Sequence, residues 1–311
     1  MGHRKTATML TYRGLMAPVF TPFKNDVHKT LNVDVIPSYA DYCQKNGIKG
    51  ILVNGTTGEG SSMTTKERKL VTEVWMEQCK SRKQHLMVQV GGISLPDVLS
   101  LAAHAEKTGA DSILCLPELF QKPTSIADLI RYLKMVAKAA PNTPLLYYHI
   151  PRMTHVNIHM GTFLNSVGNS IPTFSGIKFS STVLDEGLAA VKADKEKYCV
   201  FLGAHAIMAG AYTLGFSLGI ATTQNIFPQF GETILKSIMK GQLLQAQETQ
   251  ADLNTAVNII NKYGPFVPSM KAAMQILSSV PVGETREPVT PVPVEQMKKM
   301  EIELRALPFI K

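Results

Sequence analysis

Short apolar runs alternate with longer amphipathic segments along most of the chain. Eight such runs begin at Leu15, Gly50, Leu86, Asp111, Pro144, Phe174, Tyr198 and Leu218. The segments between them, such as residues 65–80, 95–108 and 126–139, carry apolar residues at helical spacing with charged residues in between. This alternation is typical of parallel βα units, in which a buried strand is followed by a helix that packs on the sheet.

Eight consecutive βα units close most naturally into a TIM (β/α)8 barrel of about 250 residues. The chain has 311 residues, and residues 243–263, 267–279 and 294–307 predict further helices. We therefore expect an N-terminal tail at 1–11, the barrel at 12–232, and the last barrel helix with a C-terminal helical extension at 233–311. A doubly wound open sheet is disfavoured because no G-x-G-x-x-G loop follows the first strand.

Composition limits the partners and the location of the chain. Hydrophobic residues make up 45% and charged residues 18%, which excludes a disordered chain. Residues 206–231 carry no charge, but glycines and Pro228 interrupt them, so a short buried helix and a buried strand are expected rather than a membrane span. The net charge is +8 without a basic tract, which leaves an anionic small molecule plausible and disfavours nucleic acid.

The cysteines and histidines lack the spacings of metal sites. Four separate cysteines indicate a reduced, cytoplasmic chain, and no H-E-x-x-H pattern accompanies the histidines. We therefore expect no metal. Gly2 and Thr6 fit the short pattern for N-myristoylation, although such a match arises easily by chance.

A glycine-rich segment, GTTGEG at residues 55–60, follows the second predicted strand. In a TIM barrel, functional groups gather at the carboxyl ends of the strands. Glycines let the backbone approach a ligand, and the hydroxyls of Thr56 and Thr57 with nearby N–H groups can bind a carboxylate or a phosphate. A glycine-rich turn capped by threonine fits the same pattern.

Lys178 lies in the sixth predicted strand. Because side chains alternate along a strand, Gly176, Lys178 and Ser180 share one face, and Ile177 and Phe179 share the other. If the bulky pair packs against helices, the lysine points into the barrel, where loss of hydration favours the neutral, nucleophilic amine. The alternative is a lysine at the strand end with its amine in water.

The fifth predicted strand carries two adjacent tyrosines, and either can face inward. Tyr148 is nearer the carboxyl end and could move a proton at the neighbouring lysine. A tyrosine that fills the core is the ordinary alternative.

Three motifs together resemble the N-acetylneuraminate lyase and dihydrodipicolinate synthase superfamily. They are GTTGEG at 55–60, YYHIP at 147–151 and GIKFS at 176–180, and the resemblance extends over residues 12–307. The variants VNGTTGEG and IPTFSGIKFS are most similar to the animal N-acetylneuraminate lyases. The resemblance implies a homotetrameric TIM barrel that forms a Schiff base between a lysine and pyruvate, without a metal ion or another cofactor.

The resemblance also implies roles for individual residues. Lys178 matches the Schiff-base lysine, Tyr148 matches the proton-relay tyrosine, and Thr56 and Thr57 match the pair that holds the pyruvate carboxylate. Ser180 stands where the superfamily has a hydroxyl near the sugar chain.

The chain departs from the sialate lyases after its seventh strand. The segment 203–206 reads Gly203, Ala204, His205, Ala206, where those enzymes have a glycine, any residue, an aspartate and a glutamate. His205 and Ala206 cannot accept the same charge-assisted hydrogen bonds from a polyhydroxyl chain. Thr222 keeps the hydroxyl of the segment after the eighth strand. Gly203, His205, Ala206 and Thr222 complete the predicted substrate-binding set.

Three functional interpretations follow. The first is a Schiff-base aldolase that cleaves N-acetylneuraminate to pyruvate and N-acetylmannosamine. The second keeps this chemistry for a less hydroxylated pair of 2-oxo acid and aldehyde, because His205 and Ala206 replace the acidic pair. The third is a catalytically inactive barrel that binds a 2-oxo acid.

Overall fold

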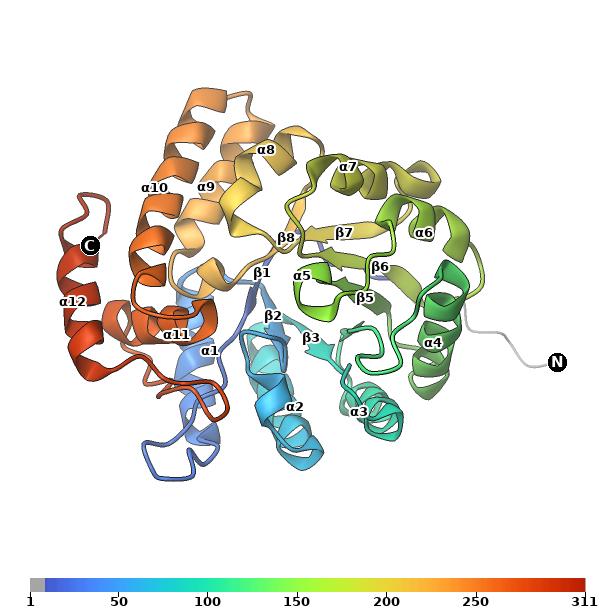
Figure 1. The fold of residues 1–311 in the computed structure, drawn as a ribbon, viewed down its shortest axis with the longest axis horizontal. Coiled ribbons are helices and arrows are strands. Elements are labelled where there is room, and N and C mark those ends of the chain that lie inside the picture. The colour runs from blue at the N-terminus through green and yellow to red at the C-terminus, as the bar shows by residue number, and fades with distance from the viewer. Residues whose placement is uncertain (1–8, 311) are drawn as a thin grey trace.

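Eight parallel strands form a closed barrel in which each strand pairs with its neighbours in chain order. The computed structural model describes residues 9–310, and Figure 1 shows the helices around the strands. The predicted TIM barrel is confirmed, and every predicted apolar run contains or overlaps one strand. The strands are β1 (Leu15–Pro18), β2 (Gly50–Val53), β3 (His85–Gln89), β4 (Ser112–Cys115), β5 (Leu145–His149), β6 (Phe174–Phe179), β7 (Cys199–Leu202) and β8 (Leu218–Ile220).

Helices follow the strands and cover the outside of the barrel (Figure 1). The uncharged segment forms a short helix and then β8, as predicted. The boundary that we placed between residues 232 and 233 falls within α9. The helices up to this point are α1 (Ile36–Lys45), α2 (Thr65–Arg82), α3 (Leu95–Thr108), α4 (Ile126–Ala139), α5 (Pro151–Thr154), α6 (Met160–Val167), α7 (Leu184–Lys192), α8 (Met208–Thr213) and α9 (Pro228–Met239).

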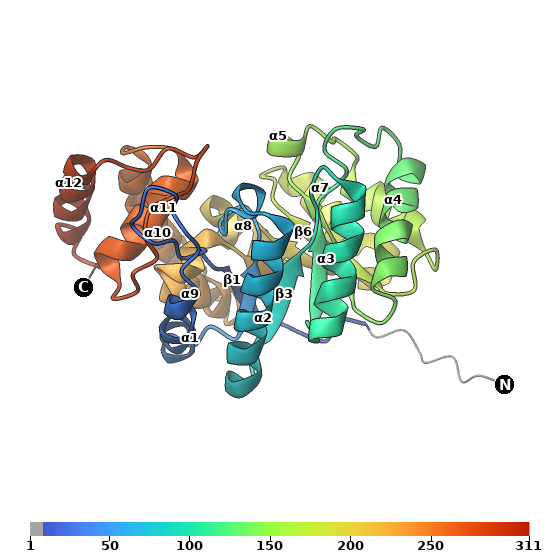
Figure 2. The same cartoon turned by 90° about the horizontal axis from the view of Figure 1, so that it is seen from below.

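Three further helices form the C-terminal extension: α10 (Leu243–Asn261), α11 (Phe266–Leu277) and α12 (Val294–Arg305). Figure 2 shows them gathered beside α9 and α1 at one side of the barrel. The expected helical extension is therefore present. Gly2 and Thr6 lie outside the described residues, as does most of the expected tail. Across residues 9–310, no helix combines the length and the apolar character that crossing a lipid bilayer demands.

Local chemistry determines several helix ends. Thr64 and Glu67 form a capping box at the start of α2, and the Ser125 side chain accepts the Asp128 backbone N–H at the start of α4. Gly109 ends α3 with a left-handed φ of 89°, which glycine adopts without a steric penalty. These signals explain why the predicted bounds of α3 and α4 match the structure.

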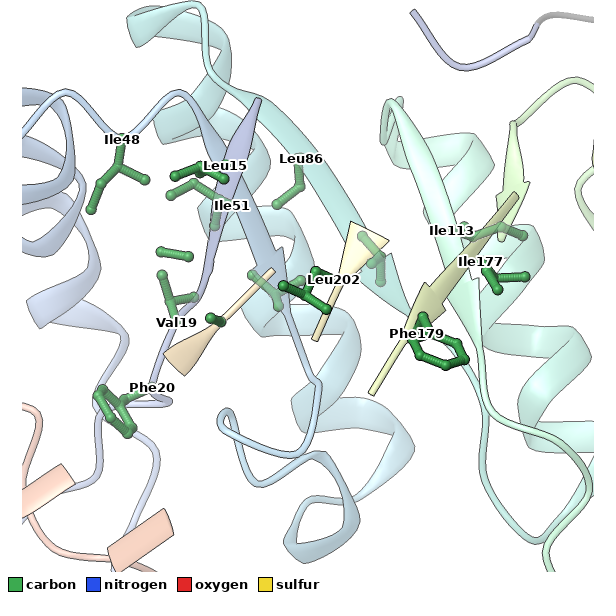
Figure 3. Close-up of a cluster of buried hydrophobic side chains, with 14 of the residues drawn as sticks. Leu15, Val19, Phe20, Ile48, Ile51, Leu86, Ile113, Ile177, Phe179 and Leu202 are labelled. Atoms are coloured by element: carbon green, nitrogen blue, oxygen red, sulfur yellow. The ribbon is translucent and has the colours of Figure 1, made fainter. Parts of the chain in front are cut away.

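Two apolar layers lie on opposite faces of the barrel strands. Figure 3 shows part of the outer layer, between strands and helices, to which Ile177 and Phe179 belong. A smaller cluster inside the barrel includes Leu146, Tyr148 and Phe201. The predicted alternation along β6 is therefore confirmed, because Ile177 and Phe179 pack towards the helices. Lys178 consequently faces the barrel interior.

Candidate active site

A glycine in β6 allows β7 to approach the strand that carries Lys178. Gly176 has a φ of 149°, and a Cβ at this position would lie 1.9 Å from the Cys199 carbonyl oxygen, so only glycine allows β7 to approach this closely. Two residues later, Lys178 is in register with Tyr148 on β5 and with Phe201 on β7. The pairing places the lysine and the tyrosine side by side within the barrel.

The Lys178 amine, the Tyr148 phenol and the Thr56 hydroxyl form a continuous polar chain. Lys178 Nζ donates to Tyr148 Oη at 3.1 Å and lies 4.2 Å from the centroid of the same ring. Thr56 Oγ1 is 3.2 Å from Tyr148 Oη. Lys178 is only 5% exposed and Tyr148 only 2%. These three hydrogen-bonded side chains therefore connect β6, β5 and the loop after β2 in the buried interior of the barrel.

The environment of Tyr148 favours loss of the phenol proton. Burial by itself raises the pKa of Tyr148. The positive charge of Lys178, together with hydrogen bonding from Thr56, Lys178 and Ser180, outweighs burial and lowers this pKa below that of a free phenol. A phenol that ionises readily is suited to moving protons beside the amine.

A second polar contact connects the loop after β2 with the segment after β8. Thr57 Oγ1 lies 2.7 Å from Thr222 Oγ1, and both residues are buried. Asn225 holds this segment by donating to the carbonyl oxygens of Thr222 and Pro18, at 3.0 and 2.8 Å. The structure thus brings Thr56, Thr57 and Thr222 to one end of the barrel, as the sequence predicted.

The absence of a side chain at Gly203 provides room for the Ser180 side chain. A Cβ at position 203 would lie 2.0 Å from Ser180 Oγ, well inside van der Waals contact. The Gly203 N–H donates to the Phe179 carbonyl oxygen at 2.7 Å, which fixes the approach of β7 to β6. Ser180 is therefore held close to the Tyr148 phenol, whose pKa it helps to lower.

His205 and Ala206 lie against the C-terminal extension. The His205 ring stacks on Phe266 at the start of α11, with centroids 5.5 Å apart and planes 5° from parallel. Burial, and then the positive charge of Arg152, lower the pKa of His205 to about 4, so the imidazole is neutral at pH 7. The side chain of Ala206 is exposed, and its carbonyl oxygen accepts from Asn254 Nδ2 at 3.2 Å. The contacts described for these two residues are with the C-terminal extension, not with the hydrogen-bonded set of Lys178, Tyr148 and Thr56.

Sequence reasoning missed a buried ion pair behind the Thr56–Thr57 loop. Lys271 Nζ on α11 lies 2.7 Å from Glu59 Oε1, and both side chains are 1% exposed. Burial lowers the pKa of Lys271 to about 8, although the Glu59 carboxylate opposes this shift. A signal was present in the sequence, because Lys271 is the only charged residue of α11. A lone cation in the middle of an apolar helix predicts a buried charge that needs a partner.

The comparisons with known proteins agree with this geometry. Residues 11–307 match the model of the dihydrodipicolinate synthetase family. The chain is 36% identical to N-acetylneuraminate lyase A of Xenopus laevis (89% of this chain, 90% of the relative) and 34% identical to the human N-acetylneuraminate lyase (96% and 93%). The solved structure of the Aliivibrio salmonicida N-acetylneuraminate lyase superposes with a TM-score of 0.91 at 31% identity, covering 96% of this chain and 98% of that one. On this evidence, the chain belongs to the dihydrodipicolinate synthetase family.

Proposed function

We propose that this protein is a class I aldolase that cleaves N-acetylneuraminate to pyruvate and N-acetylmannosamine through a Schiff base on Lys178. The observation that carries the proposal is the contact of 3.1 Å between the buried Lys178 amine and the Tyr148 phenol. The similarity to animal and bacterial N-acetylneuraminate lyases supports the choice of substrate.

The first step forms the imine. The Tyr148 phenolate takes a proton from the Lys178 ammonium, the freed amine attacks the C2 carbonyl carbon of the open-chain 2-oxo acid, and the carbinolamine then loses water. Tyr148, 3.1 Å from Nζ, exchanges protons with the amine and with the departing hydroxyl. Thr56 and Thr57 donate hydrogen bonds to the carboxylate and thereby fix C2 beside the amine, while Thr222 orients Thr57.

The second step breaks the bond between C3 and C4. The Tyr148 phenolate takes the proton of the C4 hydroxyl, the aldehyde of N-acetylmannosamine leaves, and the bonding electrons pass to the imine nitrogen to give an enamine. The proton that Tyr148 took from the C4 hydroxyl passes to C3 and restores the protonated imine, which water hydrolyses to pyruvate and the Lys178 ammonium. Because the protonated imine accepts the electron pair, this route requires neither a metal ion nor another cofactor.

The remaining predicted residues surround the sugar chain in this proposal. The Ser180 hydroxyl binds it next to Tyr148, and Gly203 provides the room for Ser180. The neutral imidazole of His205 offers one donor and one acceptor to a substrate hydroxyl, whereas Ala206 offers no side-chain hydrogen bond. Sialate binding then depends less on charge than it would with an acidic pair.

The other two interpretations receive less support. A catalytically inactive barrel has no need of a buried amine in contact with a phenol, since burying a charge is costly. A less hydroxylated substrate rests on His205 and Ala206 alone, whereas the relatives named above are N-acetylneuraminate lyases.

The test combines turnover with trapping of the imine. Purified protein should release pyruvate from N-acetylneuraminate with saturable kinetics. Treatment with pyruvate and borohydride should leave a reduced adduct on the peptide that contains Lys178. A Lys178→Arg variant, which keeps the charge but cannot form the imine, serves as the control. Turnover that survives in this variant, or an adduct at another lysine, would contradict the proposal.

The same proposal includes a homotetramer in the cytoplasm. The tetramer rests on the resemblance, and the location is supported by four cysteines that are all free and buried, as expected in a reducing compartment. Sedimentation equilibrium and cell fractionation test the two statements separately.

A further inference from the structure

We propose that Lys271 and Glu59 form a positioning pair that holds the Thr56–Thr57 loop in the shape required to bind a substrate carboxylate. This inference rests on the proposed function and assigns a role in it to the C-terminal extension. Lys271 and Glu59 would not touch the substrate, but would act through the two threonines.

The loop adopts a conformation that its backbone does not favour. Glu59 has a φ of 52°, in the left-handed region, where a residue with a side chain is strained. Its N–H donates to the Thr56 carbonyl oxygen at 3.1 Å, and the Gly60 N–H donates to the Gly55 carbonyl oxygen at 3.1 Å. The backbone of Glu59 therefore closes the turn that presents Thr56 and Thr57, and such a strained residue persists only when its surroundings hold it.

The Glu59 side chain supplies that hold from the rear of the loop. One carboxylate oxygen accepts from Lys271 Nζ at 2.7 Å, and the other accepts from the Arg286 backbone N–H at 2.8 Å. Both groups belong to the C-terminal third of the chain. Both carboxylate oxygens are thus engaged, and rotation of the side chain would break at least one charge-assisted bond.

Lys271 is fixed just as fully. Besides Glu59, Nζ donates to the carbonyl oxygens of Thr21 and Glu284, at 2.8 and 3.0 Å, and lies 4.4 Å from the centroid of the Phe23 ring. The Thr21 hydroxyl in turn donates to the Gly58 carbonyl oxygen at 2.6 Å. Lys271 therefore secures the loop through Glu59 directly and through Thr21 indirectly.

The opposite side of the same loop carries the proposed chemistry. Thr56 contacts the Tyr148 phenol, and Thr57 contacts Thr222. Glu59 follows these threonines within the same tight turn. If its backbone left the left-handed conformation, the hydroxyls and N–H groups of the two threonines would move. Binding of a carboxylate should suffer, whereas Lys178 keeps its own contact with Tyr148 and should still form an imine.

A comparison of two ketones separates this role from a general effect on stability. Wild-type protein and a Glu59→Gln variant are titrated with pyruvate or with acetone, which lacks the carboxylate, and the borohydride-reduced adduct is quantified by intact mass. We expect Glu59→Gln to raise the pyruvate concentration for half-maximal trapping about tenfold. A shift of this size corresponds to the loss of roughly one charge-assisted hydrogen bond between the loop and the pyruvate carboxylate. The acetone titration should change by less than about twofold, because acetone makes no such bond.

Two further variants complete the experiment. Lys271→Met should shift the pyruvate titration in the same direction, and Glu59→Gln decides the matter if Lys271→Met does not fold. Glu303→Gln is the matched control, since Glu303 makes an exposed ion pair with Lys262 on the same extension. It should leave both titrations unchanged.

The outcomes distinguish this inference from the proposed function. Wild-type protein that traps neither ketone at Lys178 refutes the proposed function. Wild-type protein that traps both, with Glu59→Gln shifting both titrations equally or neither, refutes the positioning role alone.

Discussion

Replacement of Tyr148 by phenylalanine tests the proton relay most directly. The change removes only the phenol oxygen, which lies 3.1 Å from Lys178 Nζ and 3.2 Å from Thr56 Oγ1. The ring should keep its place in the inner apolar cluster. The variant therefore isolates proton transfer from packing.

The expected loss of activity is large. A positioned acid or base contributes about 10²–10⁴ in rate, or about 3–5 kcal/mol of barrier. We expect Tyr148→Phe to lower kcat for N-acetylneuraminate cleavage by a factor of about 10²–10⁴, measured as pyruvate release under saturating substrate. Borohydride trapping of pyruvate should still label Lys178, because the amine remains. A variant whose kcat stays within about threefold of wild type would refute the relay, since so small a loss of rate lies far below the contribution of acid–base catalysis.

The neighbouring tyrosine supplies the matched control. Tyr147 is fully buried on the outer face of β5, and among the described residues its hydroxyl has no hydrogen-bond partner. Tyr147→Phe removes the same atom one residue away and relieves an unsatisfied polar group. Its kcat should equal that of wild type, and its Tm should be equal or higher.

Three further predictions concern the rest of the site. Thr57→Val, which breaks the contact of 2.7 Å with Thr222, should raise KM for the 2-oxo acid about tenfold with a smaller change in kcat, as steady-state kinetics would reveal. Gly203→Ala should destabilise the protein by about 1–3 kcal/mol in urea unfolding and reduce kcat/KM, because its Cβ would displace Ser180; unchanged values would disprove the clash. The pKa of His205 is about 4 in the folded protein and about 6.5 when unfolded, so the unfolded state binds the proton first and stability falls as the pH drops through this window. Urea unfolding at pH 7 and 5 should show a loss smaller by about 2 kcal/mol in His205→Gln, and equal losses in both proteins would contradict the lowered pKa.

The barrel and most of its elements could be predicted because their signals are local. Apolar runs of strand length, helical spacing and residues such as Ser125 and Gly109 act within a few positions, and the predicted ends of α3 and α4 match the structure. Alternation predicted which residues of β6 share a face, and the packing of Ile177 and Phe179 against the helices decided that Lys178 points inward.

The choice between the two tyrosines of β5 could not be made in the same way. Each tyrosine shares its face of the strand with a leucine, Tyr147 with Leu145 and Tyr148 with Leu146, so the pattern marks neither face as the inner one. The pairing of β5 with β6 also contains a register shift between Leu145 and Leu146. Which ring meets Lys178 depends on that pairing, a tertiary property that neither strand encodes alone. The partner of Glu59 was equally hidden, because Lys271 lies 212 positions away.

This separation along the chain has a consequence for protein synthesis. The final strand ends at Ile220, whereas Lys271 lies in the second helix of the extension. All eight strands are therefore synthesised before Lys271, the residue that pairs with the Glu59 carboxylate. If the pair holds the loop as proposed, the loop receives this support only after α11 has been synthesised, later than every strand of the barrel.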